Sequence, residues 1–245
     1  MGWEHTAGVV AWHIDERAFA GPEHLDPAYV AGYERKSGYD PTPDVDALVA
    51  HGVGPSSTVL DMGAGTGAFT AAMAPRCRRV VAVDVSPAMV AAVWDRAAAD
   101  GLGNVTVVHA GLVSYEHEGP PVDAVFCRNV LHQVPDFWKG VALDRLFRAL
   151  RPGGVLRLLD LVYDVEPADV PAFVDAWFAG AVDDPAQGYT ADDLATHVRT
   201  ESSTYSWLFE PLIERVGFTI VEREYRRSAY ASYTCLRPLG ESTSR

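Results

Sequence analysis

The sequence of 245 residues predicts an α/β fold, a doubly wound, mostly parallel sheet with helices on both faces. Three observations lead to this prediction. From Ser57 onward, short runs rich in β-branched residues alternate with segments of helical apolar spacing. A glycine-rich turn within 59-VLDMGAGTGAFT-70 joins the first such run to the first helix. Hydrophobic residues make up 48% of the chain, which is enough to bury a full core.

The predicted elements follow one another regularly along the chain. A strand at 57-STVLDMG precedes a helix that begins near Thr66, and a second strand follows at 79-RVVAVDV. Ser86 and Pro87 are typical of a helix start, and Gly101 of a helix end. The next elements are a third strand at 104-NVTVVHA, a fourth at 123-DAVFCRN, a helix at 136-DFWKGVALDRLFRAL, a turn at 152-PGG and a fifth strand at 155-VLRLLDLV.

The C-terminal part completes the sheet. After the helix 209-FEPLIERVG, the runs 218-FTIVEREY and 229-AYASYTCLR are close enough to pair as a hairpin. We therefore expect a seven-stranded, mostly parallel sheet whose last strand is antiparallel.

Two segments fall outside this alternation and predict a cap. Residues 1–54 precede the first strand and contain helical pieces, whereas residues 55–245 form the main domain. The insertion 163–206 is longer than an ordinary strand-to-helix connection, which indicates a lid. Within it, Thr190 and Asp193 have the spacing of a capping box at the start of 191-ADDLATHVR.

Charge and composition narrow the partners. The net charge of −13 disfavours nucleic acid, because phosphate binding requires concentrated Lys and Arg, so we expect a small-molecule substrate. No apolar window approaches the roughly 18 residues of a membrane span. The first residues lack the pattern of a secretory signal, and the three cysteines lack metal-type or paired spacing, so we expect a cytoplasmic location. A homodimer remains open.

The glycine turn has two interpretations. As G-x-G-x-x-[GA], the residues Gly63, Gly65 and Ala68 match a dinucleotide-binding turn, with Asp84 about twenty residues further on to hold a ribose. As D-x-G-x-G-x-G, the stretch from Asp61 matches the turn that binds S-adenosylmethionine (SAM).

Asp61 favours the second interpretation. It lies at the carboxyl end of the first strand, where a pyrophosphate would meet a like charge and the α-ammonium group of SAM an opposite one. Asp61 could instead only accept amide hydrogen bonds from the turn.

Five motifs in this order resemble the class I SAM-dependent methyltransferases of the small-molecule, type 11/25-like group, which have a Rossmann-like fold. The resemblance covers about Ser57 to Arg237. Its motifs are 59-VLDMGAGTG, 80-VVAVDVSPAM, 122-VDAVFCRNVLHQV, 147-FRALRPGGVL and 209-FEPLIERVGF.

The resemblance implies a cofactor site and S-adenosylhomocysteine (SAH) as product. The glycine turn (Gly63, Ala64, Gly65 and Gly67) would wrap the methionine part, with Asp61 near its ammonium. Asp84 would accept the ribose hydroxyls. Other implied contacts are Val85 and Met89 beside the adenine, Arg128 and Asn129 along the methionine moiety, and Tyr33 and Tyr39 closing over SAM.

One position departs from the family pattern. Many relatives carry, after the third strand, an acid that binds the adenine amino group, whereas Gly111 occupies that place here. We therefore expect adenine recognition by backbone groups of Gly111 and Leu112.

His132 is the candidate catalytic base, since it follows the fourth strand on the ligand side. The alternative is a pocket-lining role. His109 is expected to be packed, and His197 to lie on a solvated face of the lid helix. No His, Asp or Glu set has metal spacing and no G-x-S-x-G elbow is present, so we expect neither metal nor serine-hydrolase chemistry.

The insertion carries nine acids against one arginine, Arg199. These acids either receive an amine or aromatic substrate or form a solvated face, with the aromatics packed on the core. Glu201, Tyr205 and Trp207 are the candidate substrate contacts.

The sequence thus predicts methyl transfer from SAM to an O or N, or a C, nucleophile of a small molecule, in bacterial secondary metabolism. One alternative is a SAM-binding fold that assists another reaction such as a cyclisation. Another is an NAD(P)-dependent oxidoreductase.

Overall fold

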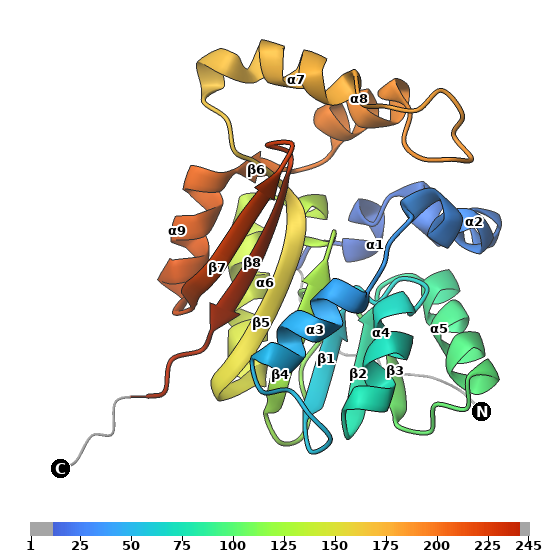
Figure 1. Cartoon of the computed structure of the whole chain (residues 1–245), viewed down its shortest axis with the longest axis vertical. Helices are drawn as coiled ribbons and strands as arrows, with labels where there is room; N and C mark the ends of the chain where they lie inside the picture. The colour runs from blue at the N-terminus through green and yellow to red at the C-terminus, as the bar shows by residue number, and fades with distance from the viewer. Residues whose placement is uncertain (1–11, 241–245) are drawn as a thin grey trace.

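A computed structural model describes residues 12–240 of the chain (Figure 1). The first part of the predicted cap, residues 1–11, lies outside this range. Three α-helices precede the sheet: α1 (Glu16–Phe19), α2 (Pro27–Ser37) and α3 (Thr42–Ala50). Among the described residues, no helix combines the length and apolarity needed to cross a bilayer.

The central sheet has the predicted α/β architecture. Its strand order is β3-β2-β1-β4-β5-β8-β7, with β6 paired to β5 off this path. The strands are β1 (Thr58–Met62), β2 (Arg79–Asp84), β3 (Val105–His109), β4 (Val122–Arg128), β5 (Leu150–Tyr163), β6 (Thr204–Tyr205), β7 (Thr219–Arg226) and β8 (Tyr230–Leu236). Strand β8 runs antiparallel to both of its neighbours, β5 and β7, and the other strand pairs of the described sheet are parallel. The seven-stranded sheet, its terminal hairpin and its antiparallel last strand are therefore confirmed, with the two-residue β6 as an addition.

Alternating residues of the strands face two helical layers. One layer holds α4 (Ala68–Met73) and α5 (Pro87–Ala99), and the other holds α6 (Asp136–Ala149) and α9 (Ser206–Val216). Val59 and Phe126 pack toward the first layer, whereas Leu60 and Val125 pack toward the second. This period-2 alternation buries both faces, as in doubly wound sheets.

Helix α3 corrects the extent of the predicted cap. Leu48 and Val45 of α3 are buried in the same core cluster as Val59, so α3 covers the sheet beside α4. Its apolar side chains therefore belong to the core of the main domain, and the part of the segment above the strand ends lies before α3.

The predicted turn at 152-PGG is a bulge within one long strand. Val122 pairs with Leu150 and Ala124 with Val155, so the intervening residues of β5 bulge opposite a single residue of β4. Gly153 has a φ of 74°, which glycine adopts at low cost.

The predicted lid, the insertion 163–206, contains α7 (Val170–Phe178) and α8 (Ala191–Thr200) on the side of the sheet where β5 ends (Figure 1). The predicted capping box is confirmed, because Thr190 and Asp193 exchange side-chain-to-backbone hydrogen bonds. Lys36 of α2 also forms an ion pair with Asp193 (3.3 Å), which joins the N-terminal helices to the lid.

Strand β1 lies between β2 and β4, so the chain crosses over in opposite directions on its two sides. Ligands of open α/β sheets bind at this switch point, outside the carboxyl ends of the strands.

Candidate active site

The glycine turn folds back tightly after β1. The N–H groups of Gly63 and Ala64 both donate to the Val83 carbonyl, at 2.8 and 3.0 Å. Gly63 has a φ of 75°, and a Cβ there would lie 2.1 Å from the Val130 side chain. A larger residue at Gly63 would therefore meet both backbone strain and a clash.

Asp84, at the end of β2, is held by the turn. One carboxylate oxygen accepts from the Gly65 N–H (2.9 Å) and the other from the Ser86 N–H (2.8 Å). Burial raises the pKa of Asp84, and these two backbone hydrogen bonds oppose the rise. Each oxygen retains a further lone pair for a ligand hydroxyl.

Asp61 lies at the end of β1 and is 1% exposed. The Thr70 hydroxyl of α4 donates to it. Burial raises the pKa of Asp61 to about 7, the Thr70 hydrogen bond opposes the rise, and the nearby Asp84 adds to it. No Lys or Arg within residues 12–240 forms an ion pair with Asp61, so this site favours a cationic ligand group.

Two adjoining cavities open above the turn, with empty volumes of about 710 and 520 Å³. Every candidate cofactor residue except Gly67 lines at least one of them. Gly67 instead precedes α4 in the left-handed conformation, with a φ of 82°. The fold thus brings together residues that the sequence distributes from Tyr33 to Asn129.

Arg128 supplies a positive charge to both cavities. Its guanidinium lies 3.9 Å from the centroid of the Tyr39 ring, and Tyr39 donates to Asp44 (2.9 Å). Arg157 of β5 donates to the other oxygen of Asp44 (2.9 Å). Asp44 of α3 is thereby held in place, and it in turn orients the Tyr39 ring against Arg128. Tyr33 is half-buried here, and loss of hydration raises its pKa.

Sequence reasoning missed Glu16. Its carboxylate accepts the N–H groups of Val113 (2.6 Å) and Ser114 (2.8 Å), and a Cβ on Gly111 would lie 2.5 Å from it. The Gly111 N–H is occupied by the Ser114 hydroxyl (2.8 Å), so it is not free for a ligand as expected. A carboxylate from α1 therefore lies beside Gly111 after all, and no local sequence signal links Glu16 to Val113, which are 97 positions apart.

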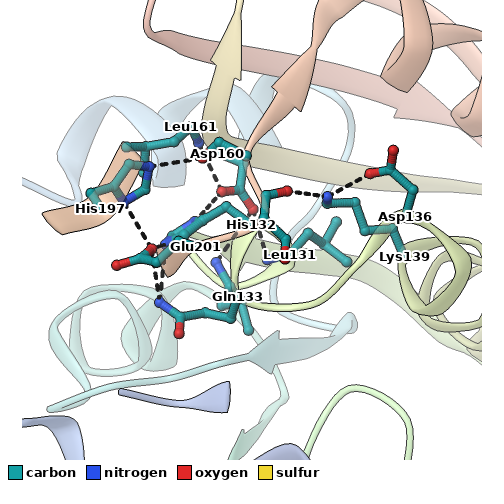
Figure 2. Close-up of polar contacts among 12 residues, drawn as sticks. Leu131, His132, Gln133, Asp136, Lys139, Asp160, Leu161, His197 and Glu201 are labelled. Atoms are coloured by element: carbon teal, nitrogen blue, oxygen red, sulfur yellow. Dashed lines mark hydrogen bonds and ion pairs between the residues drawn. The ribbon is translucent and has the colours of Figure 1, made fainter. Parts of the chain in front are cut away.

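His132 belongs to a polar cluster on the lid side (Figure 2). Its Nδ1 contacts Asp160 of β5, and its Nε2 lies 2.9 Å from Glu201 at the end of α8. The same Glu201 oxygen lies 2.8 Å from Nδ1 of His197, whose Nε2 contacts the Ser203 hydroxyl at 2.8 Å. Sequence analysis predicted separate roles for His132 and Glu201, whereas the structure brings them into contact.

The cluster shifts the pKa of its members. Burial lowers the pKa of His132, but Asp160 and then Glu201 outweigh it and raise the pKa to about 9. Burial likewise opposes the ionisation of Glu201, but the two histidines lower its pKa to about 2. In this arrangement Nε2 of His132 is engaged by Glu201, and His132 itself does not line the cavities.

Several expectations about side-chain environments were wrong. His109 is exposed and contacts the Val85 carbonyl (3.0 Å), because it lies at the end of β3 on the sheet edge. His197 is 9% exposed, since its face of α8 turns toward Trp177 and His132. No metal spacing was expected, but ligand-type atoms of His197 and Glu201, four positions apart on the lid, meet one of His132 from the core.

The exposure of the lid side chains distinguishes between the two interpretations, which were substrate contact and a solvated acidic face with packed aromatics. All of its nine acids except Asp193 and Glu201 are exposed, and Trp177 packs with Phe173 and Tyr163, so these groups follow the packed and solvated alternative. Tyr205 stacks on Trp207, which is 48% exposed, and neither lines the two cavities.

Comparisons with known proteins agree with the fold and the turn. Residues 59–154 match a family described as methyltransferase domain. The chain is 38% identical over 195 residues to a demethylmenaquinone methyltransferase of Clavibacter sepedonicus, covering 74% of each chain. It is 29% identical to a tRNA 5-carboxymethoxyuridine methyltransferase of Escherichia coli strain K12, covering 82% of this chain and 77% of that protein.

A third relative is matched only in part. The ubiquinone/menaquinone biosynthesis C-methyltransferase UbiE of Hydrogenovibrio crunogenus is 33% identical over 133 residues, which cover 52% of this chain and 51% of the relative. The chain therefore spans about half the length of that relative.

Solved structures share the fold at low sequence identity. The N-methyltransferase NodS of Bradyrhizobium japonicum, in complex with SAH, is 18% identical with a TM-score of 0.57, covering 80% of this chain and 87% of NodS. The [4+2]-cyclase SpnF is 17% identical with a TM-score of 0.61, covering 81% of each chain. The sheet order, the acid-containing glycine turn and these matches show that the chain belongs to the class I SAM-dependent methyltransferase family.

Proposed function

We propose that this protein transfers a methyl group from SAM to an O or N, or a C, nucleophile of a small molecule. The observation that carries the proposal is the pair of carboxylates at the glycine turn, the buried Asp61 and the half-buried Asp84, facing a cleft with Arg128. This charge pattern favours a ligand with a cationic group and neutral hydroxyls, and it disfavours a pyrophosphate. It supports SAM over the dinucleotide alternative.

The residues present fit the parts of SAM. Asp61 would bind the ammonium and Arg128 the carboxylate of the methionine moiety, while Asp84 would accept the ribose hydroxyls. Val85, Met89 and Leu112 supply apolar surface for the adenine. Bound SAM supplies an electrophilic methyl group that carries its own leaving group, so the task of the protein is alignment of the acceptor.

The acceptor would enter between the cavity and the lid. Gln133 lines the larger cavity and also contacts His132 (3.0 Å), so it links the cofactor site to the polar cluster. The predicted role of His132 as a base would require Nε2 to be released from Glu201. Tyr205 and Trp207 remain predicted acceptor contacts.

A small acceptor in the cytoplasm is supported by charge and redox state. The net charge of −13 opposes polyanions, and Cys77, Cys127 and Cys235 are free thiols, as expected in a reducing compartment. The names of two relatives refer to a quinone or to quinone biosynthesis, which makes small aromatic acceptors the first class to test. A role in secondary metabolism is part of the proposal.

The test is incubation with methyl-labelled SAM and a panel of phenols, reduced naphthoquinones and small amines, with SAH release as the readout. SAM at about 100 times its Kd should also stabilise the protein by ~2.7 kcal/mol. Asp84→Ala should weaken SAH binding by at least ~100-fold, because charged hydrogen bonds contribute about 1.5–3 kcal/mol each. Asp95→Ala, an exposed change on α5, is the matched control.

The outcomes are distinct. Unchanged SAH affinity in Asp84→Ala would falsify the assignment of the glycine turn. SAM binding without SAH release from any acceptor would favour the alternative of a SAM-binding fold that assists a cyclisation. The likeness to SpnF concerns the fold alone and does not favour that alternative.

A further inference from the structure

Three side chains from the core and the lid converge on one point. Nε2 of His132, Nδ1 of His197 and a carboxylate oxygen of Glu201 all lie within 4.8 Å of one another (Figure 2). His132 is 5% and His197 9% exposed, so water has little access. His132 comes from the segment after β4, whereas His197 and Glu201 come from α8 and its C-terminal end.

The outward nitrogens of both imidazoles have partners that fix the rings. Nδ1 of His132 contacts Asp160, whose two oxygens also accept from the Leu131 and Leu161 N–H groups (2.7 and 2.8 Å). Nε2 of His197 contacts the Ser203 hydroxyl. Carboxylate and hydroxyl partners of this kind orient histidines that bind metals through the other nitrogen.

The inward side of the cluster is not satisfied by hydrogen bonds alone. Nε2 of His132 lies 2.9 Å from a Glu201 oxygen, which requires a proton on Nε2, and 3.0 Å from the Gln133 amide nitrogen, which requires a lone pair. Reversing the Gln133 amide replaces the second conflict by another, since its oxygen would then face the Glu201 carboxylate at 3.5 Å. A cation at the centre removes the conflict, because it accepts lone pairs from the two imidazole nitrogens, the Glu201 carboxylate and the Gln133 amide oxygen.

Charge leads to the same conclusion. Asp160 and Glu201 bring two negative charges into a buried cluster, and Lys139 is engaged with Asp136 and the Ser202 carbonyl. A divalent ion that displaces the proton of His132 would balance the two carboxylates with both imidazoles neutral, which is the form in which histidine binds metals.

We propose that His132, His197 and Glu201 bind a divalent transition-metal ion of the Zn²⁺ or Fe²⁺ type, with the fourth position facing Gln133 and the cofactor cavity. Two imidazoles and one carboxylate suit such ions better than Mg²⁺, which prefers oxygen ligands. A tetrahedral ion with bonds of ~2.0–2.1 Å spaces its ligands by ~3.3–3.4 Å. The observed separations of 2.8 and 2.9 Å therefore need to widen by only about half an ångström.

The ion would fix the lid to the core, because two of its ligands belong to the lid and one to the core. Its fourth position would accept an oxygen atom, either from Gln133 or from an acceptor that reaches past it. This binding is independent of methyl transfer, since it involves the chain alone.

The experiment uses the full chain without a polyhistidine tag, freed of metal with a chelator. Zn²⁺ is titrated by calorimetry. Co²⁺ is followed by its visible ligand-field absorption and by quenching of tryptophan fluorescence, since Trp177 contacts the His197 ring. We expect one ion per chain in the wild type. His197→Gln and Glu201→Gln should lose this stoichiometric binding, and Asp160→Asn should weaken it by ~10- to 100-fold.

His117→Gln is the matched control, because His117 contacts Tyr115 and Pro120 and lies outside the cluster. It should bind metal like the wild type, and thermal melting of the metal-free variants checks that they fold. Absence of one-to-one binding by the wild type, or binding unchanged in both His197→Gln and Glu201→Gln, overturns the proposal. Metal binding without methyl transfer would contradict only the proposed function.

Discussion

At the residue scale, the glycine turn illustrates how much one acid adds to a common motif. Asp61 and Asp84 lie at the ends of the neighbouring strands β1 and β2. Burial is the main cause that raises the pKa of Asp61, and the negative charge of Asp84 raises it further. The sequence predicted that both acids lie at strand ends beside the ligand. It could not predict their electrostatic coupling, which depends on the two strands being neighbours.

We expect SAH affinity to depend on pH through Asp61. With a pKa of about 7, Asp61 is neutral in the ligand-free protein at lower pH, and binding of an ammonium group must displace its proton. The Kd of SAH should therefore rise by up to ~tenfold per pH unit as pH falls below about 7. Calorimetry between pH 5.5 and 8.5 measures this.

For Asp61→Asn, the affinity for SAH should depend less on pH and should be weaker than in the wild type at pH 8.

The stability of the ligand-free protein should change with pH in the direction opposite to the affinity for SAH. Because the folded-state pKa is above the unfolded value of 3.8, the free energy of unfolding of the ligand-free protein should fall as pH rises toward and through 7. If the free energy of unfolding and the SAH affinity changed equally with pH in the wild type and in Asp61→Asn, the raised pKa of Asp61 would not be their cause.

Glu16 makes a second residue-scale prediction. It is the carboxylate beside Gly111, the position at which the family pattern predicts an acid for the adenine amino group. Glu16→Ala should weaken SAH binding by about tenfold, the equivalent of 1.4 kcal/mol. It should also reduce the preference for SAH over S-inosylhomocysteine, in which a carbonyl oxygen replaces that amino group.

Glu118→Ala, an exposed change in the same region, is the control for charge alone. Loss of affinity for both ligands in equal measure would show that Glu16 only anchors α1 to the backbone after β3.

At the element scale, α8 combines a predicted start with an unpredicted environment. The capping box at Thr190 and Asp193 is local, so spacing alone identified it. The burial of Leu194 and His197 depends on Trp177 of α7, which no spacing within α8 reveals. For the same reason, the bulge in β5 was predicted as a turn. Gly153 and its neighbours have turn chemistry, but the flanking Leu150 and Val155 pair with β4, and Gly153 and Gly154 exchange backbone hydrogen bonds with Arg237.

Thr190→Ala should loosen α8 without unfolding the sheet. Loss of an N-cap hydrogen bond costs about 1 kcal/mol, and α8 carries His197 and ends at Glu201. Amide exchange should accelerate about fivefold in residues 191–200 and stay unchanged in β1 and β4, as measured by mass spectrometry. Thr196→Ala, an exposed change on the same helix, is the control, and equal acceleration there would contradict a capping effect.

At the scale of the whole molecule, charge separates this chain from a polyanion-binding relative. The net charge of −13 should prevent stable tRNA binding, although the Escherichia coli relative is named for a tRNA substrate. Filter binding at about 50 mM salt should show no retention of tRNA, because non-specific binding depends on counterion release by cationic side chains. Salt-sensitive retention at one tRNA per chain would contradict the small-molecule proposal.

The sequence by itself determined the sheet, its helices and the cofactor turn, because their signals are local: alternation along strands, caps at helix ends, and an acid two residues before a glycine. Only the tertiary structure decided which distant groups meet. It placed Glu16 of α1 beside Gly111, and it brought His197 and Glu201 of the lid to His132 of the core. These contacts arise from the packing of the N-terminal helices and the lid over the strand ends, and such packing leaves no periodic trace in the residues that make it.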